Sequence, residues 1–283
     1  MNKYIFYFCL LIILILLIPS FVSSQGKGKQ SSEGSTVYDM VDPNNLEIDG
    51  YFEMDDYKAN ATAKVKKARV HLQADAKLFD APDLTFRYGL AKNLEAQLIT
   101  GYTGILTNGN VSLRAKKNRI ISANKNATGL DALGLGMKVG LITNRDARPS
   151  VALTGILTLP NVGVPVFTPN NPGGEIDINL YNELNNYFDI QYGAGTIWSG
   201  YDLDPHISYS YYITPGVSFS DDVGLYLDLT GSTENGISPD NRFDFDLSFA
   251  LNDYTTLDVY AGSSFNIKKF FYIGASFTAT IPF

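Results

Sequence analysis

The stretch from Phe271 to Phe283 alternates strictly between apolar and polar positions, and this alternation constrains the fold more than any other feature of the chain. The apolar residues are Phe271, Ile273, Ala275, Phe277, Ala279, Ile281 and Phe283. Because successive side chains of a β-strand point to opposite faces, the pattern predicts a strand with one apolar and one polar face. Such a strand suits a membrane β-barrel, whose lipid-facing and lumen-facing residues alternate. It also suits the last strand of a soluble secreted sandwich.

Residues 1–24 have the features of a secretory signal peptide. Asn2 and Lys3 precede an apolar run from Tyr4 to Ile18, and small residues follow up to Ser24. The run is shorter than the ~20 residues that a spanning helix needs, so we expect cleavage near Ser24. The single cysteine, Cys9, lies in this segment. The mature chain is therefore expected to contain no disulfide and no reactive thiol.

The rest of the chain offers no candidate for a membrane-spanning helix. Every later apolar run is interrupted within a few residues by Asp, Asn, Gly or Lys. A membrane protein without spanning helices must be a closed barrel, because each unpaired backbone group in hydrocarbon costs several kcal/mol. The 18 Tyr, 17 Phe and 25 Gly, against one Trp, are typical of strands and turns. We therefore predict an all-β fold, a transmembrane antiparallel up-and-down β-barrel.

The alternation recurs in segments of about 9–11 residues, the length of a tilted membrane strand. Short connectors alternate with longer ones such as Gly104–Gly129, as expected for periplasmic turns and outside loops. We predict about twelve strands over residues 46–283, preceded by a flexible periplasmic lead-in over residues 25–45. Leu46–Met54 and Val70–Leu78 both alternate. One of the two is expected to merge into a longer hairpin arm or to lie outside the barrel.

The strand that reaches Phe283 also resembles the recognition signal read by the bacterial barrel-assembly machinery. The residues that carry this resemblance are Phe277, Ala279, Ile281 and Phe283. The resemblance implies that this strand is a partner of that machinery. It also implies that the mature chain lies among the lipids of a Gram-negative outer membrane.

A second resemblance covers roughly Leu84 to Phe283. The block LTFRYGLAKNLE at Leu84–Glu95, the block GLDALGLGMK at Gly129–Lys138 and the step Thr158-Leu159-Pro160 follow one another in the chain. Together with Phe243–Phe283, they are similar to the outer-membrane transporter family of the MetA pathway of phenol degradation. The resemblance implies a barrel that passes small molecules, aromatic compounds being one class, and it names no permeant.

Arg87 and Glu95 form the best-motivated pair of charged residues. If the hairpin turn centres on Ala91, the two lie directly opposite each other on the lumen side. Opposite charges in cross-strand register stabilise a sheet by roughly 0.2–1 kcal/mol. We interpret the pair as a barrel-filling ion pair in preference to a selectivity element.

Other charged residues of the strands are expected to point inward, because a Lys or Arg on the lipid face at mid-depth costs ~2–4 kcal/mol. The lumen and selectivity candidates are Arg87, Glu95, Lys138, Asp189, Asp228, Arg242, Asp244, Asp246 and Asp258. Glu47, Asp49, Lys77 and Asp177 are expected on the same face. Inward glycines, namely Gly134, Gly136, Gly140, Gly193 and Gly195, are expected to leave space in the lumen.

The chain is acidic, with a formal net charge of -7, which argues against nucleic acid as a partner. The acidity is read either as a solvated surface or as an interior that favours cations and neutral molecules. His71 and His206 are the only histidines, so we predict no metal site, and no cofactor is expected.

These observations favour a passive channel or uptake transporter for small molecules over two alternatives. The first alternative is a barrel-embedded lipid hydrolase using Asp204, His206 and Ser208. Residues two apart on a strand diverge by ~6–7 Å, which is too far for a triad, so we expect no catalytic residue. The second alternative is a structural or ligand-binding outer-membrane protein that acts through its outside loops.

Overall fold

The computed structural model describes residues 40–65, 68–114, 118–142, 149–165, 167–198, 200, 207–234, 239–266 and 270–283. The predicted signal peptide and lead-in residues 25–39 lie outside the described residues. The strands are β1 (Asn45–Val65), β2 (Ala68–Ala91), β3 (Leu94–Arg114), β4 (Asn118–Leu130), β5 (Leu133–Ile142), β6 (Ser150–Leu159), β7 (Gly173–Asn185), β8 (Phe188–Trp198), β9 (Ile207–Ser218), β10 (Val223–Glu234), β11 (Asp240–Asn252), β12 (Thr255–Ser264) and β13 (Phe271–Pro282). Within these ranges no helix is long and apolar enough to cross a membrane.

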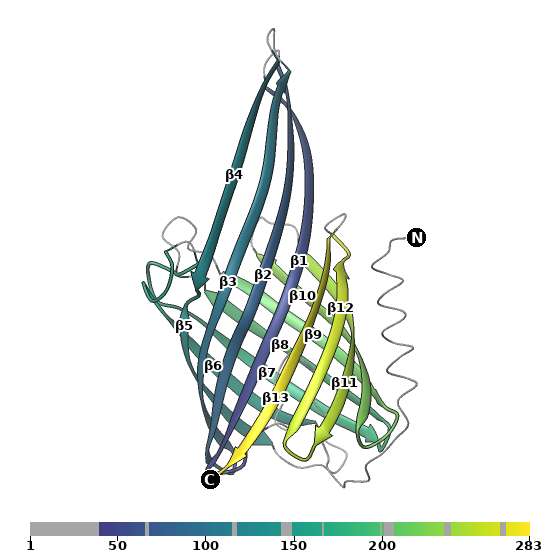
Figure 1. Cartoon of the computed structure of the whole chain (residues 1–283). Helices are drawn as coiled ribbons and strands as arrows, with labels where there is room; N and C mark the ends of the chain where they lie inside the picture. Colours follow the sequence, from purple (N-terminus) through teal and green to yellow (C-terminus); the bar gives the residue numbers. More distant parts are fainter. Residues whose placement is uncertain are drawn as a thin grey trace.

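Twelve of these strands, all but β4, form a closed antiparallel barrel (Figure 1). The ring closes where β1 pairs with β13 on one side and with β2 on the other. Pairing of β1 with β13 runs from Asn45 opposite Pro282 to Asp56 opposite Phe271. Closure leaves the ring without an unpaired edge, as a sheet in a membrane requires. The predicted fold class and strand number are confirmed.

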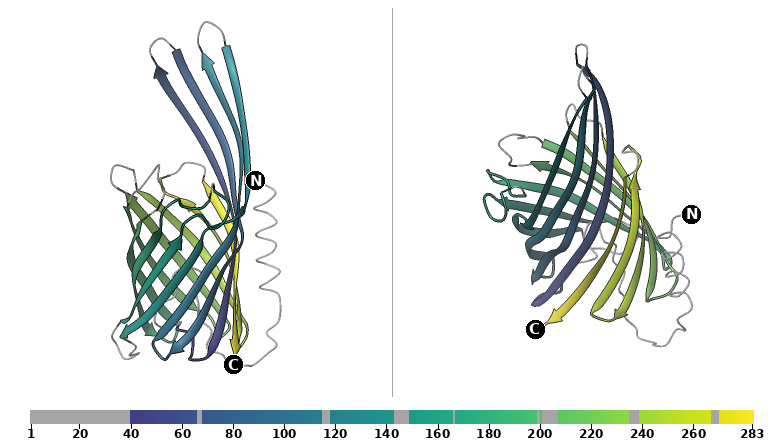
Figure 2. Two further views of the ribbon diagram at one scale, coloured as in Figure 1. Left: turned by 90° about the vertical axis from the view of Figure 1, so that its left-hand side faces the viewer. Right: turned by 45° about the horizontal axis from the view of Figure 1, so that its top comes forward.

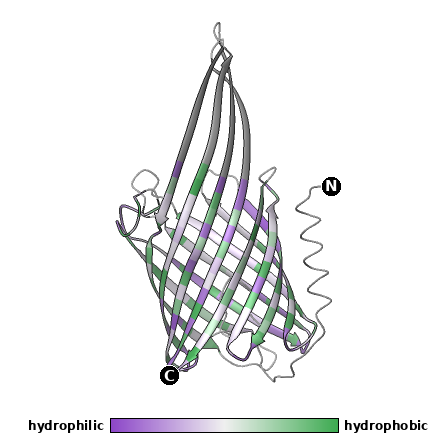
Figure 3. Cartoon of the chain, in the orientation of Figure 1, coloured by the Kyte–Doolittle hydropathy of each residue, from purple (hydrophilic) through white to green (hydrophobic). Residues whose placement is uncertain are grey.

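The side chains of the ring follow the predicted alternation, with polar groups inside and apolar groups outside. On β5, Leu135 and Met137 are 46% and 52% exposed, whereas Lys138 is fully buried. On β13, Ser276 donates a hydrogen bond to Asp258 at 2.9 Å across the lumen face. Green and purple residues alternate along the ring strands in Figure 3. The apolar band faces the surroundings of the barrel, where a lipid bilayer would meet it.

Short turns lie at one end of the ring and longer connections at the other. The short-turn end holds Lys92–Asn93, Asn186–Tyr187 and Asp253–Tyr254. Asn45 and Pro282 also lie at this end, paired with each other. The long-loop end carries the connections between β6 and β7 and between β10 and β11, among others.

A four-stranded extension rises beyond the ring at the long-loop end (Figures 1 and 2). Strands β1, β2 and β3 have 21, 24 and 21 residues, whereas β5 to β13 have 10 to 13. Above Asp56, where pairing with β13 ends, β1 continues along β2 as far as Val65. The prediction of a loop over Gly104–Gly129 is wrong, because this segment contains the upper part of β3 and most of β4, which pair with each other up to Arg114 opposite Asn118.

The upper half of β2 is the segment that sequence periodicity read as a separate strand. Val70–Leu78 and the segment that starts at Asp83 belong to the same strand, β2. The expectation that one alternating segment merges into a longer hairpin arm is confirmed. Similarly, β4 continues β5 upward, because both pair with β3. Asp131 and Ala132 interrupt the two strands, and the Asp131 N–H donates to the Gly101 carbonyl at 2.9 Å.

A β-bulge in β2 changes which residues face the lumen. Tyr51 pairs with Asp83 but Glu53 pairs with Asp80, so two steps along β1 match three along β2. An extra residue in one strand exchanges its two faces beyond the bulge. Lys77 was expected inward, but it is exposed and pairs with Leu106, which is 41% exposed. The prediction for Lys77 is therefore wrong.

Candidate functional site: the lumen of the barrel

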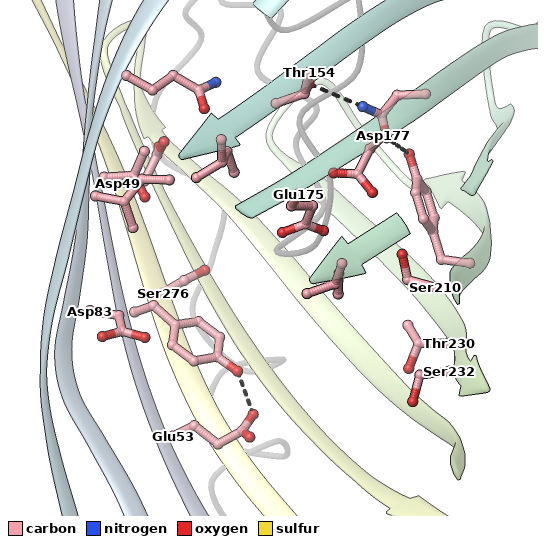
Figure 4. Close-up of a pocket in the computed structure, with 18 of the residues that line it drawn as sticks. Asp49, Glu53, Asp83, Thr154, Glu175, Asp177, Ser210, Thr230, Ser232 and Ser276 are labelled. Carbon is pink, nitrogen blue, oxygen red and sulfur yellow. Dashed lines mark hydrogen bonds between the residues drawn. The ribbon is translucent and has the colours of Figure 1, made fainter. Parts of the chain in front are cut away.

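The lumen contains a cavity of about 750 Å³ (Figure 4). Its lining runs from Arg87 and Gln97, toward the short-turn end, to Ser232 and Asp240, at the long-loop end. Side chains from strands on opposite sides of the ring contribute to it. A cavity of this size can hold a small organic molecule together with water.

The wall of the cavity is acidic. Among the described residues, the lining carboxylates are Asp49, Glu53, Asp83, Glu175, Asp177, Asp240 and Asp258. The lining bases in the same set are Arg87 and Arg242. Figure 4 shows Asp49 and Asp83 on one wall, with Glu175 and Asp177 across the cavity. A cavity lined by one sign of charge with walls of low dielectric concentrates ions of the opposite sign.

Arg242 at the long-loop end is already paired. Its Nη2 lies 2.9 Å from Asp240 Oδ2, and its Nε donates to the same oxygen at 2.9 Å. Its guanidinium carbon also lies 4.9 Å from the centre of the Phe270 ring. The positive charge of Arg242 is thus held against the wall and largely compensated locally.

Arg87 is the centre of an ion-pair network at the lower end of the cavity. Its Nε and Nη2 donate to the two carboxylate oxygens of Glu95 at 2.8 and 3.0 Å. Its Nη1 donates to Glu47 and lies 3.7 Å from Asp49 Oδ2. Gln97 adds a hydrogen bond to Glu95 at 2.7 Å. A bidentate, fully desolvated arrangement of this kind fixes the geometry of both charged groups.

The hairpin register differs from the predicted one. Ala91 pairs with Leu94, so the turn consists of Lys92 and Asn93 and does not centre on Ala91. Arg87 is therefore opposite Gln97, and Glu95 is opposite Gly89. The expectation that Arg87 and Glu95 lie directly opposite is wrong. The ion pair forms diagonally instead, which the long arginine side chain allows.

Other polar side chains of the lumen are buried and do not line the cavity. They are Glu95, Lys138, Asp189, Asp228, Asp244 and Asp246. Tyr272 donates to Asp244 at 2.6 Å, and Thr214 donates to Asp228. Of the nine lumen candidates, only Arg87, Arg242 and Asp258 line the cavity.

Sequence reasoning missed several residues that line the cavity. Glu53, Asp83 and Glu175 are acidic members, and Ile99, Ile156 and Ile197 add apolar surface. The signal was present in part, since Glu53 has the same parity on β1 as Glu47 and Asp49. The other members could be found only from the strand register, because Glu175 pairs with Ile156 on β6 and with Ile197 on β8 and therefore shares their face.

The inward glycines do not leave empty space, contrary to expectation. A Cβ on Gly193 would lie 2.5 Å from Tyr212 Cε1, and a Cβ on Gly195 would collide with Asp177. At Gly134 and Gly136 the nearest neighbours include Ile99, Gln97 and Ile156. Gly193 and Gly195 thus let the side chains of Tyr212 and Asp177 lie close against the wall.

One side chain seated in this way belongs to a hydrogen-bond chain across three strands. Tyr212 on β9 donates to Asn179 Oδ1 at 2.8 Å, and Asn179 Nδ2 donates to Thr154 Oγ1 on β6 at 3.3 Å (Figure 4). All three residues line the cavity. The chain fixes the wall opposite Asp49 and Asp83.

The hydrolase alternative receives no geometric support. Asp204 and His206 lie outside the described residues, and Ser208 pairs with Ile197 and Glu234 on the neighbouring strands. In the part of the chain that the structure describes, no group of three or more His, Cys, Asp or Glu side chains could hold a metal ion.

Comparison with known proteins places the architecture. No protein-family model matches the chain, and no curated protein does. The COG4313 outer membrane channel from Pseudomonas putida F1 is similar in structure, with a TM-score of 0.59 and 13% identity, covering 89% of this chain and 100% of that one. This chain therefore shares the barrel fold of that outer-membrane channel. The Pseudomonas putida toluene transporter TodX is also similar, with a TM-score of 0.51 and 10% identity over 89% of this chain and 92% of that one.

Proposed function

We propose that this protein is an outer-membrane channel for the passive passage or uptake of small cationic or neutral molecules. The observation that carries the proposal is the lumen cavity of about 750 Å³, whose described lining has seven carboxylates and two guanidinium groups. A ring of carboxylates replaces part of the hydration shell of a cation and repels an anion. The excess of negative charge therefore favours cations over anions of similar size.

The mixed wall suits organic molecules as well as simple ions. Ile99, Ile156 and Ile197 bring apolar surface to the same cavity as Glu175 and Asp177. Sites for small molecules combine apolar lining with a few polar groups that fix orientation. A permeant with a small apolar body and an ammonium group would contact both parts of this wall.

The motifs and the fold together support an assignment to the transporter family of the MetA pathway of phenol degradation. The LTFRYGLAKNLE block forms the β2–β3 hairpin, and the GLDALGLGMK block spans the junction of β4 and β5. Toluene is the substrate that the name of TodX gives to that protein. We propose that the permeants of the present protein are likewise small organic molecules.

The location follows from the same proposal. Residues 1–24 would direct export, and the short-turn end would face the periplasm, as in other outer-membrane barrels. Phe277, Ala279 and Ile281 on β13 would be recognised by the barrel-assembly machinery, together with Phe283. Bilayer lipid would contact the exposed apolar residues of the ring.

A swelling assay with proteoliposomes tests the function. Small solutes of similar size but with positive, neutral or negative charge are compared in vesicles that contain folded protein. We expect entry of the cationic and neutral solutes to exceed entry of the anionic solute. Folding is checked by heat-modifiable mobility on a gel. No entry of any solute into vesicles that contain folded protein would contradict the proposal.

The four-stranded extension favours a second candidate function, binding of a partner outside the cell. Beyond the ring, β1 pairs with β2 up to Val65 opposite Ala68, and β3 pairs with β4 up to Arg114 opposite Asn118. The extension therefore offers a structured surface and not a loose loop. If this role is primary, shortening both hairpins at the rim abolishes partner binding and leaves solute entry unchanged.

A further inference from the structure

The segment that precedes β1 enters the short-turn end of the lumen. We call residues Met40–Asn44 the strap. Val41, within it, is only 3% exposed, and its backbone N–H donates to Glu95 Oε2 at 3.2 Å. Glu95 itself is fully buried. The strap therefore lies against the inner wall of the barrel rather than hanging free below it.

A second set of contacts fixes the strap at the rim. The Asn44 N–H donates to the Gly89 carbonyl at 2.9 Å, and the Asn45 N–H donates to the Asp42 carbonyl at 3.0 Å, which closes a turn. Asn44 has a φ of 65°, a left-handed conformation that asparagine tolerates better than most residues. Pro43 also forms a parallel bridge with Gly89. The strap is thus anchored at both of its ends.

Gly89 makes this close approach possible. A Cβ on Gly89 would lie 2.6 Å from the Val41 carbonyl oxygen and would also collide with the Asp42 carbonyl. These are backbone atoms, so a change of side-chain rotamer cannot relieve the collision, and the strap itself has to move. A side chain at position 89 would therefore displace the strap while leaving the charged groups of the wall unchanged.

Glu95 connects the strap to the cavity. Its Oε2 accepts from Arg87 Nη2 at 3.0 Å as well as from the Val41 N–H. Arg87 lines the cavity from below, whereas Glu95 does not. One carboxylate thus lies between the permeation cavity and the segment at the short-turn end.

We infer that the strap is a gate that closes the periplasmic end of the lumen, with the Arg87–Glu95 pair as its latch. The inference rests on the proposed channel function. In this arrangement the strap covers the polar groups of β2 and β3 at the short-turn end, and its release exposes Glu95 and, behind it, Arg87 at that end. A neutral permeant that presents a hydrogen-bond acceptor to Arg87 from the cavity competes with Glu95 and weakens the hold on Val41.

Thiol labelling of Val41→Cys tests the position of the strap without relying on transport. Cys9 is the only other cysteine and lies within residues 1–24. A charged maleimide should label Val41→Cys slowly compared with Tyr187→Cys, at a turn residue that is 63% exposed. Adding Gly89→Ala should raise the labelling rate of Val41→Cys about tenfold. Adding Gly155→Ala should not, since a Cβ there meets nothing within 4 Å.

Single-channel conductance then tests the gate. Gly89→Ala should raise the mean conductance or the open fraction by about twofold or more, and Gly155→Ala should leave both unchanged. Glu95→Gln, which keeps the shape but removes the charge of the latch, should act in the same direction and guards against misfolding of the alanine variant. Fast labelling of Val41→Cys alone, or faster labelling in Gly89→Ala with unchanged conductance, would overturn the inference. A silent wild-type channel would instead refute the proposed function, while the labelling result would still report the position of the strap.

Discussion

Asp228 on β10 and Asp244 on β11 lie directly opposite each other inside the barrel, 0% and 3% exposed. Each side chain accepts a hydrogen bond from a hydroxyl group: Thr214 donates to Asp228, and Tyr272 donates to Asp244. Like charges in direct cross-strand register destabilise a sheet. The pair is therefore unfavourable when both carboxyl groups are ionised.

Replacing one member of this pair should stabilise the barrel. Asp244→Asn keeps an oxygen that can accept from Tyr272 but removes the repulsion with Asp228. We expect the free energy of unfolding in urea to rise by about 0.2–1 kcal/mol. Asp253→Asn, in an exposed turn, is the matched control and should change nothing. A loss of stability in Asp244→Asn would show that the carboxylate is needed where it is.

Removing the guanidinium of Arg87 should have the largest effect on stability. Arg87→Ala leaves Glu95 buried without its bidentate partner and removes the donor to Glu47. Breaking a buried ion pair from one side typically costs about 3–5 kcal/mol. Unfolding in urea measures the loss, with Lys92→Ala in the exposed turn as control. A change below about 0.5 kcal/mol, the usual range of a surface substitution, would contradict the role of Arg87.

The inward glycines should be intolerant of alanine. Gly193→Ala places a methyl group against the Tyr212 ring and the Ile178 carbonyl. It should destabilise the barrel by about 1–3 kcal/mol, the usual cost of overpacking. Gly155→Ala, with open space around it, should be close to neutral. Thermal unfolding of the two variants makes the comparison, and equal melting temperatures would contradict the packing argument.

Charge selectivity should depend on the carboxylates of β7. Glu175→Gln combined with Asp177→Asn removes two negative charges from one wall of the cavity and keeps the shapes of the side chains. We expect the cation-to-anion permeability ratio to fall by about twofold or more. Asp221→Asn combined with Asp222→Asn, at the exposed β9–β10 turn, removes the same charge outside the lumen. An equal fall in both double variants would assign the selectivity to net charge and not to the cavity wall.

Periodicity predicted most of the fold because membrane strands make every side chain choose between lipid and lumen. The alternation of Phe271–Phe283 and the burial of Lys138 and Asp246 both follow from that choice. Periodicity fails where the backbone adds a residue. The bulge near Asp80–Asp83 reverses the facing of Lys77, and Pro82 within it is the local signal, because proline inside a sheet is found at edges and bulges. Gly104–Gly129 is rich in Gly and Asn, which favours a loop, yet its residues pair with one another as the β3–β4 hairpin.

The candidate site was harder to predict, because it depends on contacts between strands far apart in the sequence. Arg87 and Glu95 were identified as a pair because they share one hairpin. The contact of Glu95 with Val41, 54 residues earlier, could not be read from spacing. Inward glycines were expected to leave voids, whereas Gly193 and Gly195 seat Tyr212 and Asp177. A sequence shows that a side chain is absent but not which neighbour takes its place.

The reversal potential of the wild-type protein in a planar bilayer with a salt gradient tests the central claim most directly. The acidic cavity predicts discrete conductance steps and a reversal potential of the sign that cation preference produces. The potential should shrink as the salt concentration rises and screens the carboxylates. A folded protein that conducts nothing, or one with a reversal potential of the sign of anion preference, would contradict the account.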